Sequence, residues 1–324
     1  MKLLKMTVLL IGSLIMSSPV HAQPANTEAD KTTTEAISNE DAEVEAVPFK
    51  VISFNILWGN SAAPPMAEWP NRHDFVLSTI QAFDPDILGV QESLLKQSKF
   101  LRDEMKGFIF FGAGRDNGKL GGEMCAVYYR GSRFRRVGGG HFWLSDEPDT
   151  PGDRGWDAAF PRMVTWLRLR DRTDGRTFVF ANTHFDHRGK KARLNSAILM
   201  HEKMRKIAEG DPVVILGDFN CDEESEPYAE LIGLKEGETP WLVDAYRAVH
   251  PEKNEQEASY HGFQGTTEGN RIDWVLHTPD LQALTAEIDR THDGLKYPSD
   301  HYPVTATLKR IDSPDQATET DEAE

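Results

Sequence analysis

The stretch Asp211-Pro212-Val213-Val214-Ile215-Leu216-Gly217-Asp218-Phe219-Asn220 has the pattern of a buried strand that ends in polar side chains. Residues 213–216 are apolar and mostly β-branched, which favours a strand with both faces buried. Asp218 and Asn220 follow the closing glycine, so the strand would present an acid and an amide at its tip. The alternative is a loop in which the same two side chains cap the next turn. The rest of the sequence is needed to choose between the two.

Residues 1–22 have the pattern of a secretory signal peptide. Lys2 and Lys5 precede an apolar run from Met6 to Met16, and a small-residue cleavage site ends at Ala22. The apolar run is too short to span a bilayer, and no other run is long enough. We therefore expect an exported protein, periplasmic or extracellular, without a membrane span.

Two acidic segments flank the remaining sequence. Residues 23–47 carry seven acids against Lys31, and residues 311–324 carry six acids and no base. Both are typical of disordered segments, a linker and a tail, and leave residues 48–310 as one folded domain, which we expect to be a monomer. The formal net charge is −16 for the whole chain and about −6 for the folded part. A mildly acidic domain is not typical of proteins held on nucleic acid by charge alone.

The pattern of the folded part predicts many strands joined by hairpins, with a few helices between them. Strands are expected over 49–56, 86–90, 108–111, 123–130, 134–143, 162–170, 177–184, 211–216, 272–276, 284–288 and 303–308. Helices are expected over 72–83, 190–209 and 225–231, and one capped by Ser93 is expected to run to about residue 105. These elements favour an α/β fold of two packed mixed, mainly antiparallel sheets flanked by helices. We expect Cys125 and Cys221 to be buried free thiols, although an even count would permit a disulfide.

Polar residues recur at the ends of the expected strands. Each one alone could be a turn residue, a strand-edge charge or a core histidine. Together they predict one site at a common rim of the sheets. The set is Asn55, Glu92, Glu123, Arg162, His184, Asp218, Asn220, Asp273, Asp300 and His301.

The composition of this set favours a hard metal ion. Carboxylates, an amide oxygen and two histidines without a cysteine suit Mg²⁺ or Mn²⁺. The segment His184-Phe185-Asp186-His187 leaves a zinc-like pair open as an alternative, although a hydrolytic zinc site needs a third protein ligand.

Seven motifs in this chain resemble, in order and approximate spacing, those of the endonuclease/exonuclease/phosphatase superfamily of metal-dependent phosphoesterases. The resemblance covers residues 49–308 and points to a bacterial secreted branch close to the deadenylase-like members. It implies a four-layer α/β sandwich with the site on one rim. The motifs are SFNILWGN (53–60), QE (91–92), RMVTWLRL (162–169), NTHFDH (182–187), GDFN (217–220), RIDWVL (271–276) and SDHYPV (299–304).

The resemblance also implies roles for the metal and water sites. Asn55 and Glu92 are similar to the family's metal ligands, with Asp300 completing or adjoining that site. Asp218 and Asn220 resemble the pair that holds the attacking water and the scissile phosphate.

The remaining motif residues resemble the family's phosphate-binding groups. His301, oriented by Asp273, looks like the histidine of proton transfer. His184 resembles the second histidine, Glu123 lies where its carboxylate partner would be, and Arg162 is placed like the phosphate-side cation. A transition state that gains negative charge on phosphoryl oxygens asks for such donors.

The expected function is a secreted divalent-metal phosphoesterase for diester or monoester bonds. Arg188, Lys190 and Lys191 follow the His184 strand, so a basic patch beside the site is expected to bind nucleic acid or nucleotide-like substrates. The same residues could instead form the solvated first turn of a helix. The alternatives are a sphingomyelinase-like enzyme, for which no apolar membrane hairpin is found, a sugar or inositol phosphate phosphatase, and a catalytically silent binding protein on the same fold.

Overall fold

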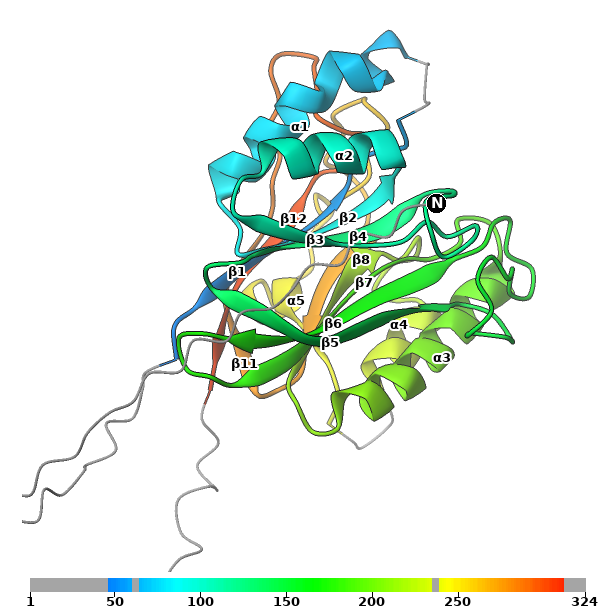
Figure 1. The fold of residues 1–324 in the computed structure, drawn as a ribbon. Coiled ribbons are helices and arrows are strands. Elements are labelled where there is room, and N and C mark those ends of the chain that lie inside the picture. Colours follow the sequence, from blue (N-terminus) through cyan, green and yellow to red (C-terminus); the bar gives the residue numbers. More distant parts are fainter. Residues whose placement is uncertain (1–45, 60–63, 235–238, 312–324) are drawn as a thin grey trace, which may run out of the picture. The chain divides into compact units, whose positions relative to one another are not determined.

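A computed structural model describes residues 46–59, 64–234 and 239–311 (Figure 1). The described residues form one compact unit. The expected signal peptide (1–22), nearly all of the acidic linker and the tail from residue 312 lie outside the described residues. In the described part of the chain, the strands form two six-stranded sheets.

Both sheets are mixed and mainly antiparallel, as predicted. In the first, the strand order is β11 (Leu281–Ile288), β12 (Val304–Arg310), β1 (Phe49–Asn55), β2 (Ile87–Ser93), β4 (Met124–Arg130) and β3 (Phe108–Phe111). In the second it is β5 (Phe134–Trp143), β6 (Met163–Asp171), β7 (Thr177–His184), β8 (Val213–Asp218), β10 (Asp273–His277) and β9 (Val243–Asp244). The pairs β1–β2 and β7–β8 are parallel, and the other named pairs are antiparallel.

Helices cover the outer face of each sheet, which gives the expected four layers. The first sheet carries α1 (Trp69–Phe83) and α2 (Leu95–Glu104), with the short 3₁₀ helix η1 (Pro65–Ala67) before them. The second carries α3 (Lys190–Ala208) and α4 (Glu226–Ile232). Figure 1 shows the two helix pairs on opposite sides of the packed sheets.

Residue alternation along the strands sorts the side chains into these layers. In β1, Val51 points into the core between the sheets, while Ile52 and Phe54 pack against α1 and α2. In β8, Val214 and Leu216 face the first sheet, and the alternate residues Val213 and Ile215 face α3. Because β1 and β8 are buried on both faces, their sequences are almost continuously apolar.

One local prediction was wrong, and two short elements were not predicted. Ser93 is the last residue of β2 rather than a helix cap, because Leu94 is the cap residue of α2 and Gln97 Oε1 accepts a hydrogen bond from the Leu94 N–H at 3.0 Å. The segment after α4 also contains β9 and α5 (Ala245–Val249), which the sequence did not indicate. Both are short, and α5 begins where the Asp244 carboxylate accepts from two backbone N–H groups.

The topology brings the predicted polar residues to one rim. In the parallel pairs, Asn55 lies opposite Gln91 and His184 lies opposite Asp218. Asp273, the first residue of β10, also lies opposite Asp218. Strand register alone therefore puts His184, Asp218 and Asp273 in one row.

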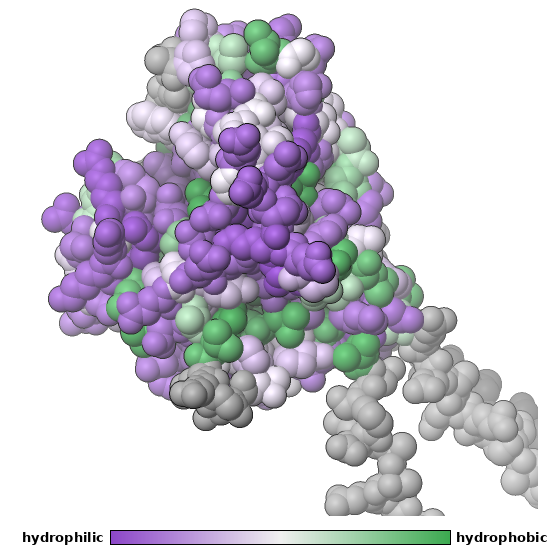
Figure 2. All heavy atoms as spheres, turned by 180° about the vertical axis from the view of Figure 1, so that it is seen from behind, coloured by the Kyte–Doolittle hydropathy of each residue, from purple (hydrophilic) through white to green (hydrophobic). Residues whose placement is uncertain are grey.

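Among the described residues, no helix combines the length and the apolar character needed to cross a bilayer. On the face drawn in Figure 2, hydrophilic side chains predominate and hydrophobic ones form separate groups.

Cys125 is buried and Cys221 half-buried, and both are free thiols.

Candidate active site

Three polar side chains of the rim surround the Oδ2 atom of Asp218. Asn55 Nδ2 donates to it at 2.9 Å, and it lies 3.4 Å from His184 Nε2 and 3.7 Å from His301 Nε2. Burial and the charge of Asp273 raise the pKa of Asp218 to about 7. A buried carboxylate surrounded by two imidazoles is suited to holding a proton or a water molecule.

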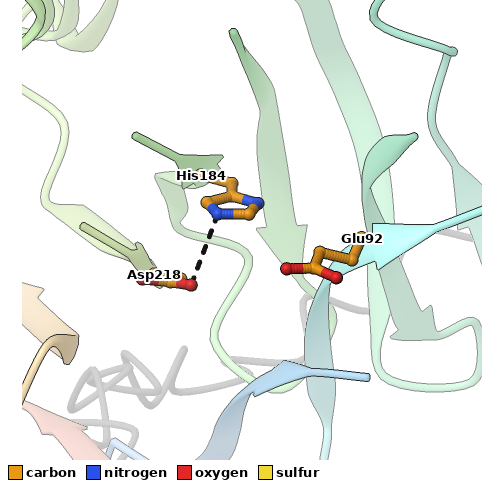
Figure 3. A group of neighbouring side chains, drawn as sticks. All are labelled: Glu92, His184 and Asp218. Atoms are coloured by element: carbon orange, nitrogen blue, oxygen red, sulfur yellow. Dashed lines mark ion pairs between the residues drawn. The ribbon is translucent and has the colours of Figure 1, made fainter. Parts of the chain in front are cut away.

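Glu92 reaches the same centre from the first sheet. Its carboxylate accepts from Asn55 Nδ2 at 3.1 Å and from the Trp58 N–H at 2.9 Å. The backbone of Glu92 has a φ of 61°, and the β2–β4 register shifts between Val90 and Ser93. Left-handed backbone at a non-glycine residue is costly and is typical of functional sites. Figure 3 shows the carboxylate facing His184 and Asp218.

Two groups of ligand-type side chains converge here. The ligand atoms of Glu92, His184 and Asp218 lie within 4.8 Å of one another, as do those of Asp218, Asp273 and His301. Carboxylate oxygens predominate, which fits a hard divalent cation. Glu92 and Asp218 are therefore the side chains that would hold such an ion.

Asn55 and Asp300 are placed differently from the other predicted ligands. The amide oxygen of Asn55 accepts from the Leu57 N–H at 3.0 Å, so its NH₂ group, not its oxygen, faces the carboxylates. Asp300 is half-buried, belongs to neither ligand group, and contacts Ser299 Oγ at 3.3 Å. Burial raises the pKa of Asp300, and the charge of Glu92 adds to this. Asp300 thus adjoins the site, and ligation by these two residues stays a prediction.

His301 and Asp273 lie within hydrogen-bond reach, as predicted. His301 Nδ1 is 2.9 Å from Asp273 Oδ2, which also accepts from Ser259 Oγ at 2.7 Å. Burial alone would lower the pKa of His301, but Asp273 and Asp218 raise it well above its ordinary value. The imidazole is therefore charged and can donate from Nε2 toward a phosphoryl oxygen.

His184 has the opposite charge state. Burial, together with Arg162 and Arg115, lowers the pKa of His184 well below its ordinary value. The prediction that Glu123 is the partner of His184 is wrong. The Glu123 carboxylate instead accepts hydrogen bonds from both terminal nitrogens of Arg115, at 2.7 and 2.8 Å. His184 Nδ1 has no partner among the described residues. A guanidinium matches a carboxylate with two parallel hydrogen bonds, which an imidazole cannot do.

Arg162 is buried beside His184. Its Nε lies 3.4 Å from Asp186 Oδ2, and its Nη2 lies 3.0 Å from His187 Nδ1. Asp186 accepts from the backbone N–H groups of Arg188 and Gly189, and His187 is exposed. Because Asp186 and His187 are used in this way, neither joins His184 in a ligand group, and the zinc-like alternative is not supported.

Asn220 reconciles the two interpretations of the GDFN stretch. Its backbone, at a φ of 52°, brings its N–H to Asp218 Oδ1 at 3.0 Å, which is the turn-capping contact. The other carboxylate oxygen, Oδ2, faces the rim. The Asn220 NH₂ group donates to the Phe185 carbonyl at 3.1 Å.

The predicted basic residues lie at the start of α3. Arg188, Lys190 and Lys191 are exposed, and their part in substrate binding stays a prediction. Arg115 and Tyr260 were missed. Arg115 lies in the loop after β3, and Tyr260 has its ring centroid 5.0 Å from that of His301. Arg115 follows the end of the expected strand 108–111 by four residues, and Tyr260 lies in a segment for which no element was expected, so neither was recognised from the pattern.

Known proteins resemble this chain in structure or in sequence. A mannosyl-6-phosphatase of Bacteroides thetaiotaomicron has a structure with a TM-score of 0.71 and 32% identity, over 80% of this chain and 99% of that chain. Nocturnin of Drosophila melanogaster is 24% identical to this chain over 322 residues, and the match covers 48% of the length of that nocturnin. The 3′-5′-exoribonuclease subunit Ccr4 of the CCR4-Not complex of Emericella nidulans is 26% identical over 233 residues, which cover 63% of this chain and 33% of that protein.

The profile of the Endonuclease/Exonuclease/phosphatase family matches residues 52–301, a stretch that contains every residue of the rim. Together with the 32% identity to a phosphatase that is covered almost completely, this match establishes the relationship. The chain belongs to the endonuclease/exonuclease/phosphatase family.

Proposed function

We propose that this chain is an exported, Mg²⁺-dependent phosphoesterase of small phosphate esters, with sugar phosphates as the first candidate substrates. Family membership makes it a hydrolase of phosphoester bonds that depends on a divalent metal ion. The choice of Mg²⁺, the substrate and the export are the proposal. The observation that carries the chemistry is the convergence of Glu92, His184 and Asp218 beside the His301–Asp273 pair.

The two histidines can divide the work because their charge states differ. Charged His301 is a donor for a phosphoryl oxygen, and neutral His184 can donate or accept a proton beside Asp218. In this proposal Asp218, the last residue of β8, and Asn220 would hold the attacking water. A divalent cation held by Glu92 and Asp218 would offset the negative charge that builds up on the phosphoryl oxygens.

Support for a sugar phosphate comes from the similarity to a mannosyl-6-phosphatase and from exposed aromatic side chains at the rim. Trp58 is 42% exposed, and its backbone N–H donates to the Glu92 carboxylate at 2.9 Å. Tyr260 is 50% exposed and stands edge-on to His301. Exposed aromatic rings beside a polar site suit the apolar face of a sugar ring or a base.

Nucleotide or RNA substrates are the second candidate. The observation in their favour is the exposed cationic run of Arg188, Lys190 and Lys191, which begins four residues after His184. Such side chains attract polyanions at low ionic strength. The match to an exoribonuclease subunit covers a third of that protein and adds support only for this candidate.

The test is a substrate profile of the purified mature chain. Sugar phosphates, nucleotides, single-stranded RNA and DNA, inositol phosphates and sphingomyelin are compared with Mg²⁺, with Mn²⁺ and with a chelator. We expect hexose phosphates to be turned over fastest, Mg²⁺ to support turnover, and the chelator or Glu92→Gln to abolish it without a change in melting temperature. Faster cleavage of RNA would select the second candidate, and turnover that survives both the chelator and Glu92→Gln would refute the metal-dependent site.

Export is tested separately. With residues 1–22 in place, cell fractionation should recover the protein outside the cytoplasm, and deletion of these residues should retain it inside. Equal distribution of the two forms would remove export from the proposal. The expected monomer is checked on the same material by light scattering.

A further inference from the structure

Arg115 is an arginine of the rim to which neither the sequence motifs nor the family resemblance assigns a role. It is 8% exposed and lies in the loop between β3 and β4. Its two terminal nitrogens clamp Glu123, and its backbone N–H donates to the Glu123 carbonyl at 2.9 Å. The guanidinium is thus fixed in one orientation by the residue that directly precedes β4.

A small cavity lies beside this clamp. Its volume is about 10 Å³, which is about the space that one water molecule or one phosphoryl oxygen requires. Glu92 and His184 belong to both its wall and the candidate metal site, so the cavity adjoins the reaction centre. The lining residues are Glu92, Arg115, Glu123, Met124, Cys125, Arg162, Met163 and His184.

Three of these lining residues carry a buried nitrogen without a hydrogen-bond partner in the described chain. The atoms are Arg115 Nε, Arg162 Nη1 and His184 Nδ1. The two guanidinium nitrogens are donors, whereas His184 Nδ1 is an acceptor when Nε2 carries the proton toward Asp218. Buried donors are nearly always paired, so two unpaired ones around one cavity indicate a missing acceptor. Both guanidiniums are close enough to His184 to act on its imidazole electrostatically. An acceptor with negative charge fits this environment best.

We propose that Arg115 joins Arg162, the phosphate-side cation implied by the family resemblance, in binding one nonbridging oxygen of the phosphoryl group that is transferred, with Glu123 as the positioning residue of Arg115. The inference rests on the proposed phosphoesterase function. It also explains why Glu123 leaves His184 unpaired, because the carboxylate aligns the guanidinium instead. Arg162 is held by Asp186 and His187, which leaves its Nη1 without a hydrogen bond. Arg115 Nε also makes no hydrogen bond, although Asp116 Oδ1 lies 4.0 Å away.

The test compares Arg115→Lys and Glu123→Gln with the parent, on the mature chain loaded with Mg²⁺. The dissociation constant of inorganic phosphate is measured by titration calorimetry, and kcat and KM are measured on p-nitrophenyl phosphate. Arg130→Lys is the matched control, because Arg130 is also paired with acids, Asp84 and Asp86, but does not line the cavity.

We expect Arg115→Lys to weaken phosphate binding and to lower kcat/KM, each by about tenfold or more, since lysine cannot reproduce the fork of the guanidinium. Glu123→Gln should show a smaller loss, and the double variant should lose no more than Arg115→Lys alone, because the carboxylate acts only through Arg115. The control should match the parent.

Parent-like phosphate binding and kcat/KM in Arg115→Lys would overturn the inference and leave the cavity to a structural water. Additive losses in the double variant would overturn the positioning role of Glu123. If Arg115→Lys does not melt cooperatively, Glu123→Gln decides, and an unchanged phosphate affinity there refutes the proposal. Phosphate binding is measured without turnover, so a parent that binds phosphate through Arg115 but hydrolyses no ester would refute the proposed function and not this inference.

Discussion

His301 stays charged in the folded protein because it lies between two carboxylates, Asp273 and Asp218. Replacing His301 with alanine should lower kcat/KM by about a hundredfold to ten-thousandfold, which is the range for a positioned proton donor. Asp273→Asn should cost less, since the aspartate acts through the imidazole. Steady-state kinetics on the best substrate, with melting curves to check the fold, measure both.

Ser259→Ala is the control for that pair. It removes the other hydrogen bond to Asp273 Oδ2 and leaves the histidine contact in place. Its kcat/KM should stay close to that of the parent. If Asp273→Asn also has parent kinetics, the imidazole is not oriented by this carboxylate.

Gly89 lets the two sheets approach each other at β2. A Cβ atom there would lie 2.2 Å from Leu216 Cδ1 and 3.0 Å from Asn182 Cγ. Asn182 bridges the sheets, since its NH₂ group donates to the Val90 and Ala126 carbonyls and its oxygen accepts from Gln91 at 2.7 Å. An added methyl group must therefore displace both a core leucine and a satisfied polar bridge.

Gly89→Ala should lower the free energy of unfolding by about 1–3 kcal/mol, the usual cost of overpacking a core. Urea denaturation followed by tryptophan fluorescence measures it. Gly138→Ala is the matched control, because this strand glycine of β5 has its nearest neighbouring atom at 3.4 Å. Equal stability of the two variants would show that the sheets can separate at β2 without loss.

The edge strands β3 and β5 meet through a histidine. The ring of His141 stacks on Phe111 with centroids 4.9 Å apart, and its Nδ1 lies 3.1 Å from Thr165 Oγ1. Burial lowers the pKa of His141 to about 4. Because the unfolded chain takes up this proton near pH 6.5 and the folded chain does not, the stability is full above that pH and falls as the pH drops toward 4.

His141→Phe should therefore reduce the acid sensitivity of the fold. Between pH 6.5 and 4, the parent should lose on the order of 1 kcal/mol more unfolding free energy than the variant, a figure reduced for the partial exposure of the ring. Urea denaturation at several pH values measures the difference. His292→Gln, at an exposed histidine, should follow the parent, and identical pH profiles for all three proteins would contradict the assignment.

At the scale of the whole molecule, the folded unit begins just before β1. Arg133 donates to the carbonyls of Val47 and Pro48, each at 2.7 Å, and Ala46 is buried. Residues 44–311 should accordingly melt within about 2 °C of the chain that begins at residue 23 and should keep its activity. A chain of residues 49–311 should melt several degrees lower, since about 1 kcal/mol corresponds to 2–4 °C at this size.

Differential scanning calorimetry of the three chains measures this boundary. A large loss of stability in residues 44–311 would mean that the outer segments contribute to the fold. The expected domain, residues 48–310, would then have to be extended.

Much of the fold could be predicted because strand patterns are local. The bounds of β7, Thr177–His184, match the expected strand, and β8 and β10 were displaced by only one or two residues. Apolar alternation, glycine and Asp-Gly turns act within a few residues of one another, so the chain order of strands and helices is visible without tertiary information. The polar strand ends were visible for the same reason.

What the sequence by itself determined is therefore the kind of elements, the two-sheet architecture and the residues offered at the rim. Only the tertiary structure decided which side chains pair there. Glu123 binds Arg115 and not His184, Asn55 turns its NH₂ group to the carboxylates, and Glu92 adopts a left-handed backbone at a shift in strand register. These outcomes depend on competition between partners that are far apart in sequence and meet only when the sheets pack, and a hydrogen bond is decided by distance and angle rather than by residue type.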